Sequence, residues 1–252
     1  MDLFVALSTL IFIVVGTAVG VRILLRSRLD HSLPELAVGA ALIAFASVSQ
    51  PLSVLRVALA GQIPIGASVA LQLVATAASA FTVLALYVFT WRVFRPESRW
   101  AALLFAGGSA LGLWAGVGTA AISYFDATVS PSLVGRWIAL SALSYAICFG
   151  WAAIESLTYY VRLRRRLRLG LADPLLVNRF LLWGGACAFA FVIDGVLLAM
   201  ALGGTDFNTD PTVRLLVSAS GLTNAVAWFL GFTPPRWYVR WMGASEPAAA
   251  PR

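Results

Sequence analysis

Residues 3–25 read LFVALSTLIFIVVGTAVGVRILL, and Arg22 is the one charged side chain in this stretch. About 20 apolar residues in a helix cross the roughly 30 Å hydrocarbon core of a bilayer. Lipid offers no partners for backbone amide and carbonyl groups, so a spanning segment must be a helix or a strand of a closed barrel. Barrel strands are about ten residues long and alternate in polarity, whereas this run is longer and unbroken. The stretch therefore predicts a transmembrane helix.

Six more apolar runs of similar length follow, with short connections between them. The chain of 252 residues is 60% hydrophobic and 12% charged, against about half and a quarter in soluble domains. We therefore predict an all-α polytopic integral membrane protein with a bundle of seven transmembrane helices in residues 1–233. A short interfacial cytoplasmic helix (234–242) and a disordered tail (243–252) are expected to follow. The seven predicted helices are Leu3–Leu25, Leu33–Ala58, Gly66–Phe94, Trp100–Tyr124, Leu133–Tyr160, Leu175–Leu202 and Val213–Phe232.

The arginines predict the orientation of this bundle. All eighteen basic residues are arginine, and they divide fifteen to three between the two sets of helix ends. Cytoplasmic loops carry the excess of basic residues, so we expect the N-terminus outside and the C-terminus inside a bacterial inner membrane. The net charge of +7 is then a topology signal that also attracts anionic lipids, and no nucleic-acid partner is expected. The three arginines on the outer side are Arg56, Arg136 and Arg214.

The residue composition argues against most cofactors. The chain has no lysine, so a retinal Schiff base cannot form. Its one histidine, His31, lies in a predicted loop, and Cys148 and Cys187 lie in apolar segments. Haem and zinc need several imidazole or thiolate ligands that converge. We therefore expect no metal, no haem and no disulfide framework.

Asp194 is the deepest ionisable residue, about eight residues from the outer end of the sixth predicted helix. An ionisable side chain at membrane depth is costly and indicates a functional candidate. Its expected partners are Arg214, Arg56 and Arg136, at the outer ends of other helices. Two interpretations stay open: a ligand-binding or sensing pocket that faces outward, and a structural ion pair between helices.

Two further polar features belong to this candidate site. Gln50 precedes Pro51, and a proline inside a helix removes a backbone hydrogen bond and kinks the helix. A carbonyl freed in this way could line a pocket. Asn224 in the seventh predicted helix is expected to face inward, although hydrogen bonds between helices would explain it equally well.

Glu155 and Arg179 form a second candidate pair near the cytoplasmic face. They lie at similar depth on the fifth and sixth predicted helices, which a short arginine-rich connection joins as a hairpin. The pair is expected to act as a cytoplasmic latch. It would be either a fixed structural clamp or a switch that breaks on signalling.

Glycines recur at four-residue spacing in the fourth predicted helix, at Gly108, Gly112 and Gly116. Such a stripe lets two helix backbones approach closely. It is expected to serve packing inside one bundle or, alternatively, to form the face of a homodimer.

Residues 231–242 read GFTPPRWYVRWM. The two prolines end the seventh helix, and arginines and tryptophans then recur four residues apart, so each pair shares a helix face. This pattern is typical of a short helix at the headgroup level of a membrane. The predicted interfacial anchor comprises Pro234, Pro235, Arg236, Trp237, Arg240 and Trp241.

This ending and the segment layout over about 240 residues resemble the N-terminal multi-span input region of bacterial sensor histidine kinases and diguanylate cyclases. The residues that carry the resemblance are Gly231, Phe232, Pro234, Pro235 and Trp237. In that family an interfacial helix passes a signal to a cytoplasmic output domain. The sequence contains no phosphoacceptor-histidine segment and no nucleotide-binding motif, so kinase or cyclase activity is not expected. The resemblance implies a separate cytoplasmic signalling partner.

We therefore predict a receptor-like sensor that couples an apolar or anionic ligand, a lipid or a membrane state to a cytoplasmic partner. The sequence offers no nucleophile elbow, phosphate-binding loop or paired-carboxylate centre, so an enzyme is not expected. A small-molecule transporter and a structural subunit of a membrane complex remain as alternatives.

Overall fold

The computed structural model describes residues 2–30, 32–124, 131–204 and 210–242, and the predicted tail at 243–252 lies outside them. All its regular elements are helical, with no strand in these ranges. Seven helices are long and apolar enough to cross a membrane, which confirms the predicted all-α class and helix count. The elements are α1 (Asp2–Asp30), α2 (Leu33–Leu42), the π-helix η1 (Ile43–Ser49), α3 (Gln50–Ala58), α4 (Ile65–Phe94), α5 (Arg99–Tyr124), α6 (Pro131–Arg168), α7 (Pro174–Leu202), α8 (Pro211–Phe232) and α9 (Arg236–Trp241).

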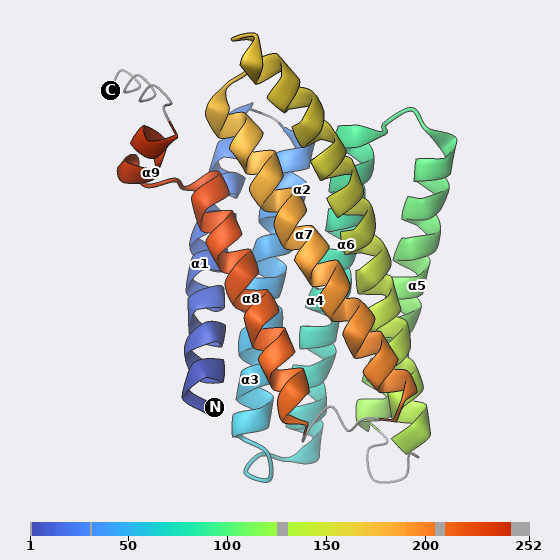
Figure 1. The fold of residues 1–252 in the computed structure, drawn as a ribbon. Helices are drawn as coiled ribbons and strands as arrows, with labels where there is room; N and C mark the ends of the chain where they lie inside the picture. The colour runs from blue at the N-terminus through green and yellow to red at the C-terminus, as the bar shows by residue number, and fades with distance from the viewer. Residues whose placement is uncertain (1, 31, 125–130, 205–209, 243–252) are drawn as a thin grey trace.

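The long helices form a closed ring in chain order (Figure 1). Each helix packs against the next, with α2, η1 and α3 acting as one segment, and α8 returns to pack against α1. The N-terminus of α1 lies at the end of the bundle opposite α9. We call the end where α1, α4, α6 and α8 finish and α9 lies the arginine-rich end.

The outer surface of the ring is apolar. Large aliphatic side chains stand exposed along the helices, with 73% of Leu103, 64% of Val117 and 67% of Ile154 accessible. Contiguous apolar surface of this kind is rare on soluble monomers and marks contact with a membrane or a partner. The surface therefore agrees with the spanning length of the helices in indicating a membrane protein.

Two of the helices begin at the same local sequence, an aspartate followed by a proline. Asp173 accepts a hydrogen bond from the Leu175 amide at 3.0 Å, and Asp210 accepts one from the Thr212 amide at 2.7 Å. An aspartate at the N-cap satisfies a free amide, and proline at the first helical position needs none. These caps fix the start of α7 and α8 one or two residues before the predicted bounds.

Helix α6 is longer than predicted. We expected it to end at Tyr160, where the apolar run stops, but it continues to Arg168. Arginine and leucine are strong helix formers, so the polar stretch prolongs the helix past the apolar segment. The chain then turns at Gly170, whose φ of 70° favours glycine.

The second spanning segment changes its hydrogen-bond pattern just before Pro51. Residues Ile43–Ser49 form a π-helix, and the Gln50 amide donates to the Phe45 carbonyl five residues back. Proline has no amide to donate, and single π-helical turns relieve such interruptions. The predicted irregularity at Gln50–Pro51 is therefore present, as a widened turn.

The glycine stripe of α5 faces the interior of the bundle. A side chain at Gly108 would overlap the ring of Tyr87 on α4, and one at Gly112 would lie 2.9 Å from the Ser144 hydroxyl on α6. A side chain at Gly116 would lie 3.6 Å from Ala80. Because the protein's own helices occupy this face, the alternative of a homodimer through these three glycines is corrected: the stripe serves packing inside the bundle.

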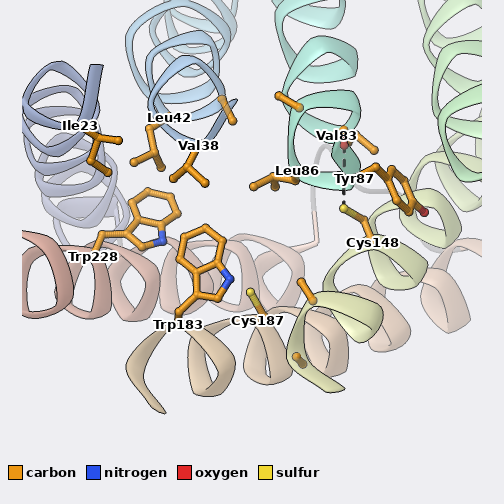
Figure 2. Packing of buried hydrophobic residues seen from close by; sticks show 14 of the residues in the cluster. Ile23, Val38, Leu42, Val83, Leu86, Tyr87, Cys148, Trp183, Cys187 and Trp228 are labelled. Carbon is orange, nitrogen blue, oxygen red and sulfur yellow. Dashed lines mark hydrogen bonds between the residues drawn. The ribbon is translucent and has the colours of Figure 1, made fainter. Parts of the chain in front are cut away.

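The core lies at the centre of the ring. Figure 2 shows Trp183 and Cys187 of α7 and Trp228 of α8 pointing toward Leu42 and Leu86 on the opposite helices. Large aromatic rings on one side meet aliphatic and small side chains on the other. The packing around these rings leaves the cavity described next.

Candidate functional site

A cavity of about 420 Å³ lies inside the ring, on the side of Trp183 and Trp228 that faces the N-terminal end of α1. We call it the central cavity. Side chains from every spanning segment except α5 line it. Much of the wall is aromatic, and the aromatic residues are Phe12, Phe45, Tyr145, Phe149, Trp183 and Trp228. Ligand pockets typically have this size and an apolar wall with a few polar groups.

Asp194 of α7 lies in the wall of the central cavity. Its Oδ2 atom is buried and has no hydrogen-bond partner among the described residues. A buried polar atom without a partner costs about 1–3 kcal/mol, and a charged one costs more. This free-energy cost therefore falls on a carboxyl group that borders the central cavity.

Three more of the predicted site residues line the same cavity: Arg214, Gln50 and Asn224. The side-chain amide of Asn224 donates to the Ser220 carbonyl at 2.9 Å, one turn back on α8. Because Gln50 directly follows the π-helix, the widened turn of the second segment sets where this side chain lies.

The other two predicted residues lie elsewhere. Arg56 and Arg136 are not in the cavity wall, and Arg136 is exposed on α6. Among the described residues no ion pair joins Asp194 to Arg56 or Arg136, and Arg214 shares the cavity wall with Asp194. These contacts give no support to the alternative of a structural ion pair at Asp194, and the outward-facing pocket stays a prediction.

The sequence analysis missed several residues of this wall. Serine and threonine hydroxyl groups come from α1, α4 and α8. The rings of Phe12 and Trp228, which also line the cavity, pack with their centroids 5.3 Å apart. Small hydroxyl residues are common in membrane helices, where they bond to their own backbone, so composition alone did not single them out. The additional serine and threonine residues are Ser8, Thr9, Thr82, Ser218 and Ser220.

The two residues of the predicted latch at the arginine-rich end, Glu155 and Arg179, each bond to a different partner. Glu155 is buried and accepts a hydrogen bond from Arg95 Nε at 2.8 Å. This hydrogen bond, together with the charge of Glu155, raises the pKa of Arg95. Arg179 instead donates from Nε to the Gly231 carbonyl at 3.0 Å, with its guanidinium 5.3 Å from the Phe232 ring. The predicted Glu155–Arg179 pair is therefore wrong: Arg95 neutralises the glutamate, and Arg179 holds the end of α8.

Helix α9 is attached to the bundle by a contact that the sequence did not indicate. The Tyr238 hydroxyl donates to Asn178 Oδ1 of α7 at 3.1 Å, and both side chains are buried. Trp237 and Trp241 are 62% and 75% exposed. The side of α9 away from α7 thus presents the predicted anchor residues, whose location at a membrane surface stays a prediction.

Trp183 connects the central cavity with the arginine-rich end. Its ring lies in the cavity wall and meets the ring of Phe232 edge to face, with centroids 6.0 Å apart. Trp183 also lines a second cavity, of about 190 Å³, on the other side of its indole. Trp183 is therefore a wall that the two cavities share.

Metal ligands do not gather in the described part of the chain. No group of three or more His, Cys, Asp or Glu residues there could hold an ion. Cys148 and Cys187 are buried and free. The absence of a cofactor stays a prediction.

The fold and the site define a class: a seven-helix protein with helices of membrane-spanning length around a central, mostly apolar cavity. Comparisons with protein-family models, with curated proteins and with solved structures find no match. The resemblance to the input regions of sensor kinases and cyclases therefore stays a prediction.

Proposed function

We propose that the protein is a receptor-like sensor of a bacterial inner membrane, which binds a small ligand in the central cavity and signals through a separate cytoplasmic partner. The observation that carries this proposal is the buried Oδ2 atom of Asp194, which lies in the wall of a cavity of about 420 Å³ and has no partner in the described structure. A structural carboxylate gains nothing from such a position. A ligand that donates a hydrogen bond removes the cost.

The cavity wall suggests the chemistry of the ligand. Most of the lining is aromatic or aliphatic, and the polar groups are those of Asp194, Arg214, Gln50 and Asn224 together with several hydroxyl side chains. Pockets of this kind bind an apolar body and use the few polar groups to orient it. We infer an amphiphilic molecule whose apolar part fills the aromatic region and whose donor group, a hydroxyl or an amine, faces Asp194.

A route for the signal starts at Trp183. Its ring contacts Phe232, the last residue of α8, directly before the turn at Pro234 and Pro235. Arg179, four residues before Trp183, lies one helical turn away on the same face of α7 and bonds to Gly231. A ligand that displaces the Trp183 ring therefore bears on the turn that sets the direction of α9. The fifteen-to-three arginine distribution supports a cytoplasmic position for this end.

The experiment is native mass spectrometry of protein released from membranes in mild detergent. We expect a retained non-lipid mass on the wild type and on Arg56→Gln, which changes an arginine outside the cavity wall. We expect Asp194→Asn to lose part of this mass, because it replaces one carboxyl oxygen by an NH₂ donor and a hydrogen bond contributes about 0.5–1.5 kcal/mol, or about two- to tenfold in affinity. A wild type without any bound non-lipid mass contradicts the proposal. If Asp194→Asn retains as much of the bound mass as the wild type, Asp194 is not part of the binding site.

A small-molecule transporter is the second candidate, and one observation favours it. The central cavity and the second cavity share Trp183 in their walls. A movement of the Trp183 indole would therefore join the two cavities. Uptake by protein-containing liposomes separates the two functions. Uptake by the wild type that rises in Trp183→Ala and is absent from protein-free liposomes favours the transporter. No uptake by the wild type or by Trp183→Ala favours the sensor.

A further inference from the structure

The second cavity lies at the arginine-rich end, between α1, α2, α4, α7 and α8. Arg22 and Arg26 of α1 and Arg179 of α7 line it, together with Glu35 of α2. We call it the arginine cavity. It is separate from the site of the proposed function, and the inference below does not depend on a ligand in the central cavity.

Positive charge is in excess around the arginine cavity. Three arginines and one glutamate line it, so basic side chains outnumber acidic ones in its wall. Glu35 Oε1 lies 4.0 Å from Arg26 Nε, the limit of an ion pair. Arg179 is half-buried, whereas Arg22 and Arg26 are exposed. Like charges repel each other more strongly where water is excluded, so the repulsion falls mainly on Arg179. An anion among the three guanidinium groups relieves this repulsion.

The type of anion follows from the side chains. Guanidinium groups present donors in a planar fork that matches the oxygens of a phosphate. The rest of the wall is apolar and includes Phe89, Phe180 and Phe232, which suits an acyl or glycerol portion better than a fully hydrated ion. Basic pockets between membrane helices are known sites for lipid headgroups.

We propose that the arginine cavity binds the phosphate headgroup of an anionic membrane lipid, with Arg22, Arg26 and Arg179 around the phosphate and the lipid chain along the phenylalanines. Arg179 also holds the Gly231 carbonyl. Because a guanidinium has five N–H donors, it can keep this bond while it contacts a phosphate. A bound lipid thus lies against the residue that fixes the end of α8.

The test uses delipidated full-length protein in detergent, titrated with phosphatidylglycerol or with phosphatidylcholine and followed by native mass spectrometry. We expect the wild type to bind phosphatidylglycerol about tenfold more tightly than phosphatidylcholine, because only the former carries net negative charge. The double variant Arg22→Gln/Arg26→Gln should lose this preference. The control Arg162→Gln/Arg164→Gln, which changes two exposed arginines of α6 outside the cavity, should keep it.

A second variant tests the site by a gain rather than a loss. Glu35→Gln removes the one negative charge of the wall, so we expect phosphatidylglycerol to bind several-fold more tightly, a result that misfolding cannot imitate. Inorganic phosphate at millimolar concentration is the competitor. If it displaces the lipid and binds as tightly alone, a free phosphate anion is the ligand and the lipid assignment is overturned. Equal binding of both lipids by the wild type, or an equal loss in the α6 control, overturns the site itself.

Discussion

The inward direction of the glycine stripe on α5 gives a sharp test of the fold. Gly107 and Gly108 are neighbours on one helix, but a side chain at Gly107 meets nothing within 4 Å, whereas one at Gly108 overlaps the Tyr87 ring. Alanine in place of glycine stabilises a helix by about 0.5–1 kcal/mol at either position. Forcing an extra carbon into a packed core costs about 1–3 kcal/mol. Gly108→Ala should therefore be less stable than Gly107→Ala by about 1–3 kcal/mol.

The free energy of unfolding in mixed micelles measures this difference. Tyr87 is fully buried and donates to the Ser144 carbonyl at 3.4 Å, so it has little room to move. The smaller side chain in Tyr87→Leu should recover part of the loss when combined with Gly108→Ala, and a double-mutant cycle would report this coupling. Equal stability of the two alanine variants would refute the inward direction. The stripe would then again be a candidate face for a dimer.

Two further predictions concern the arginine-rich end. Tyr238→Phe leaves the buried Asn178 Oδ1 without its donor, at a cost of about 1–3 kcal/mol. Amide hydrogen exchange in α9 should therefore accelerate about fivefold or more, and unchanged exchange contradicts the contact between α9 and α7. Double-mutant cycles on stability should show coupling between Glu155→Gln and Arg95→Gln, whereas Glu155→Gln and Arg179→Gln should add within about 0.5 kcal/mol. The opposite result would restore the pair expected from the sequence.

The sequence predicts the spanning helices well because a bilayer imposes one simple requirement, about 20 apolar residues in a row. The end of α6 shows where this reasoning stops. Apolarity ends near Tyr160, but a helix needs only favourable backbone and side-chain conformations, and the arginines provide these to Arg168. Hydropathy therefore locates a span and says little about how far its helix extends into water.

The candidate site could be predicted in part for a related reason. Asp194, Arg214, Gln50 and Asn224 are unusual residues in apolar helices, and all four line one cavity. Pairing partners could not be predicted, because contact depends on the rotation of each helix about its axis as well as on depth. Arg95 is 60 residues from Glu155 in sequence, and only the packing of α4 against α6 brings them together.

The two carboxylates inside the bundle differ in what surrounds them. Glu155 receives a hydrogen bond from Arg95, so its burial within α6 is compensated inside the protein. The Oδ2 atom of Asp194 receives none in the described structure, although hydroxyl and amide groups line the same cavity. Packing could have closed this space with apolar side chains at no cost in hydrogen bonds. A ligand that donates a hydrogen bond to this oxygen would offset the cost, as Arg95 does for Glu155. This contrast is the ground for our proposal that Asp194 takes part in ligand binding, whereas Glu155 joins α6 to the end of α4 through Arg95.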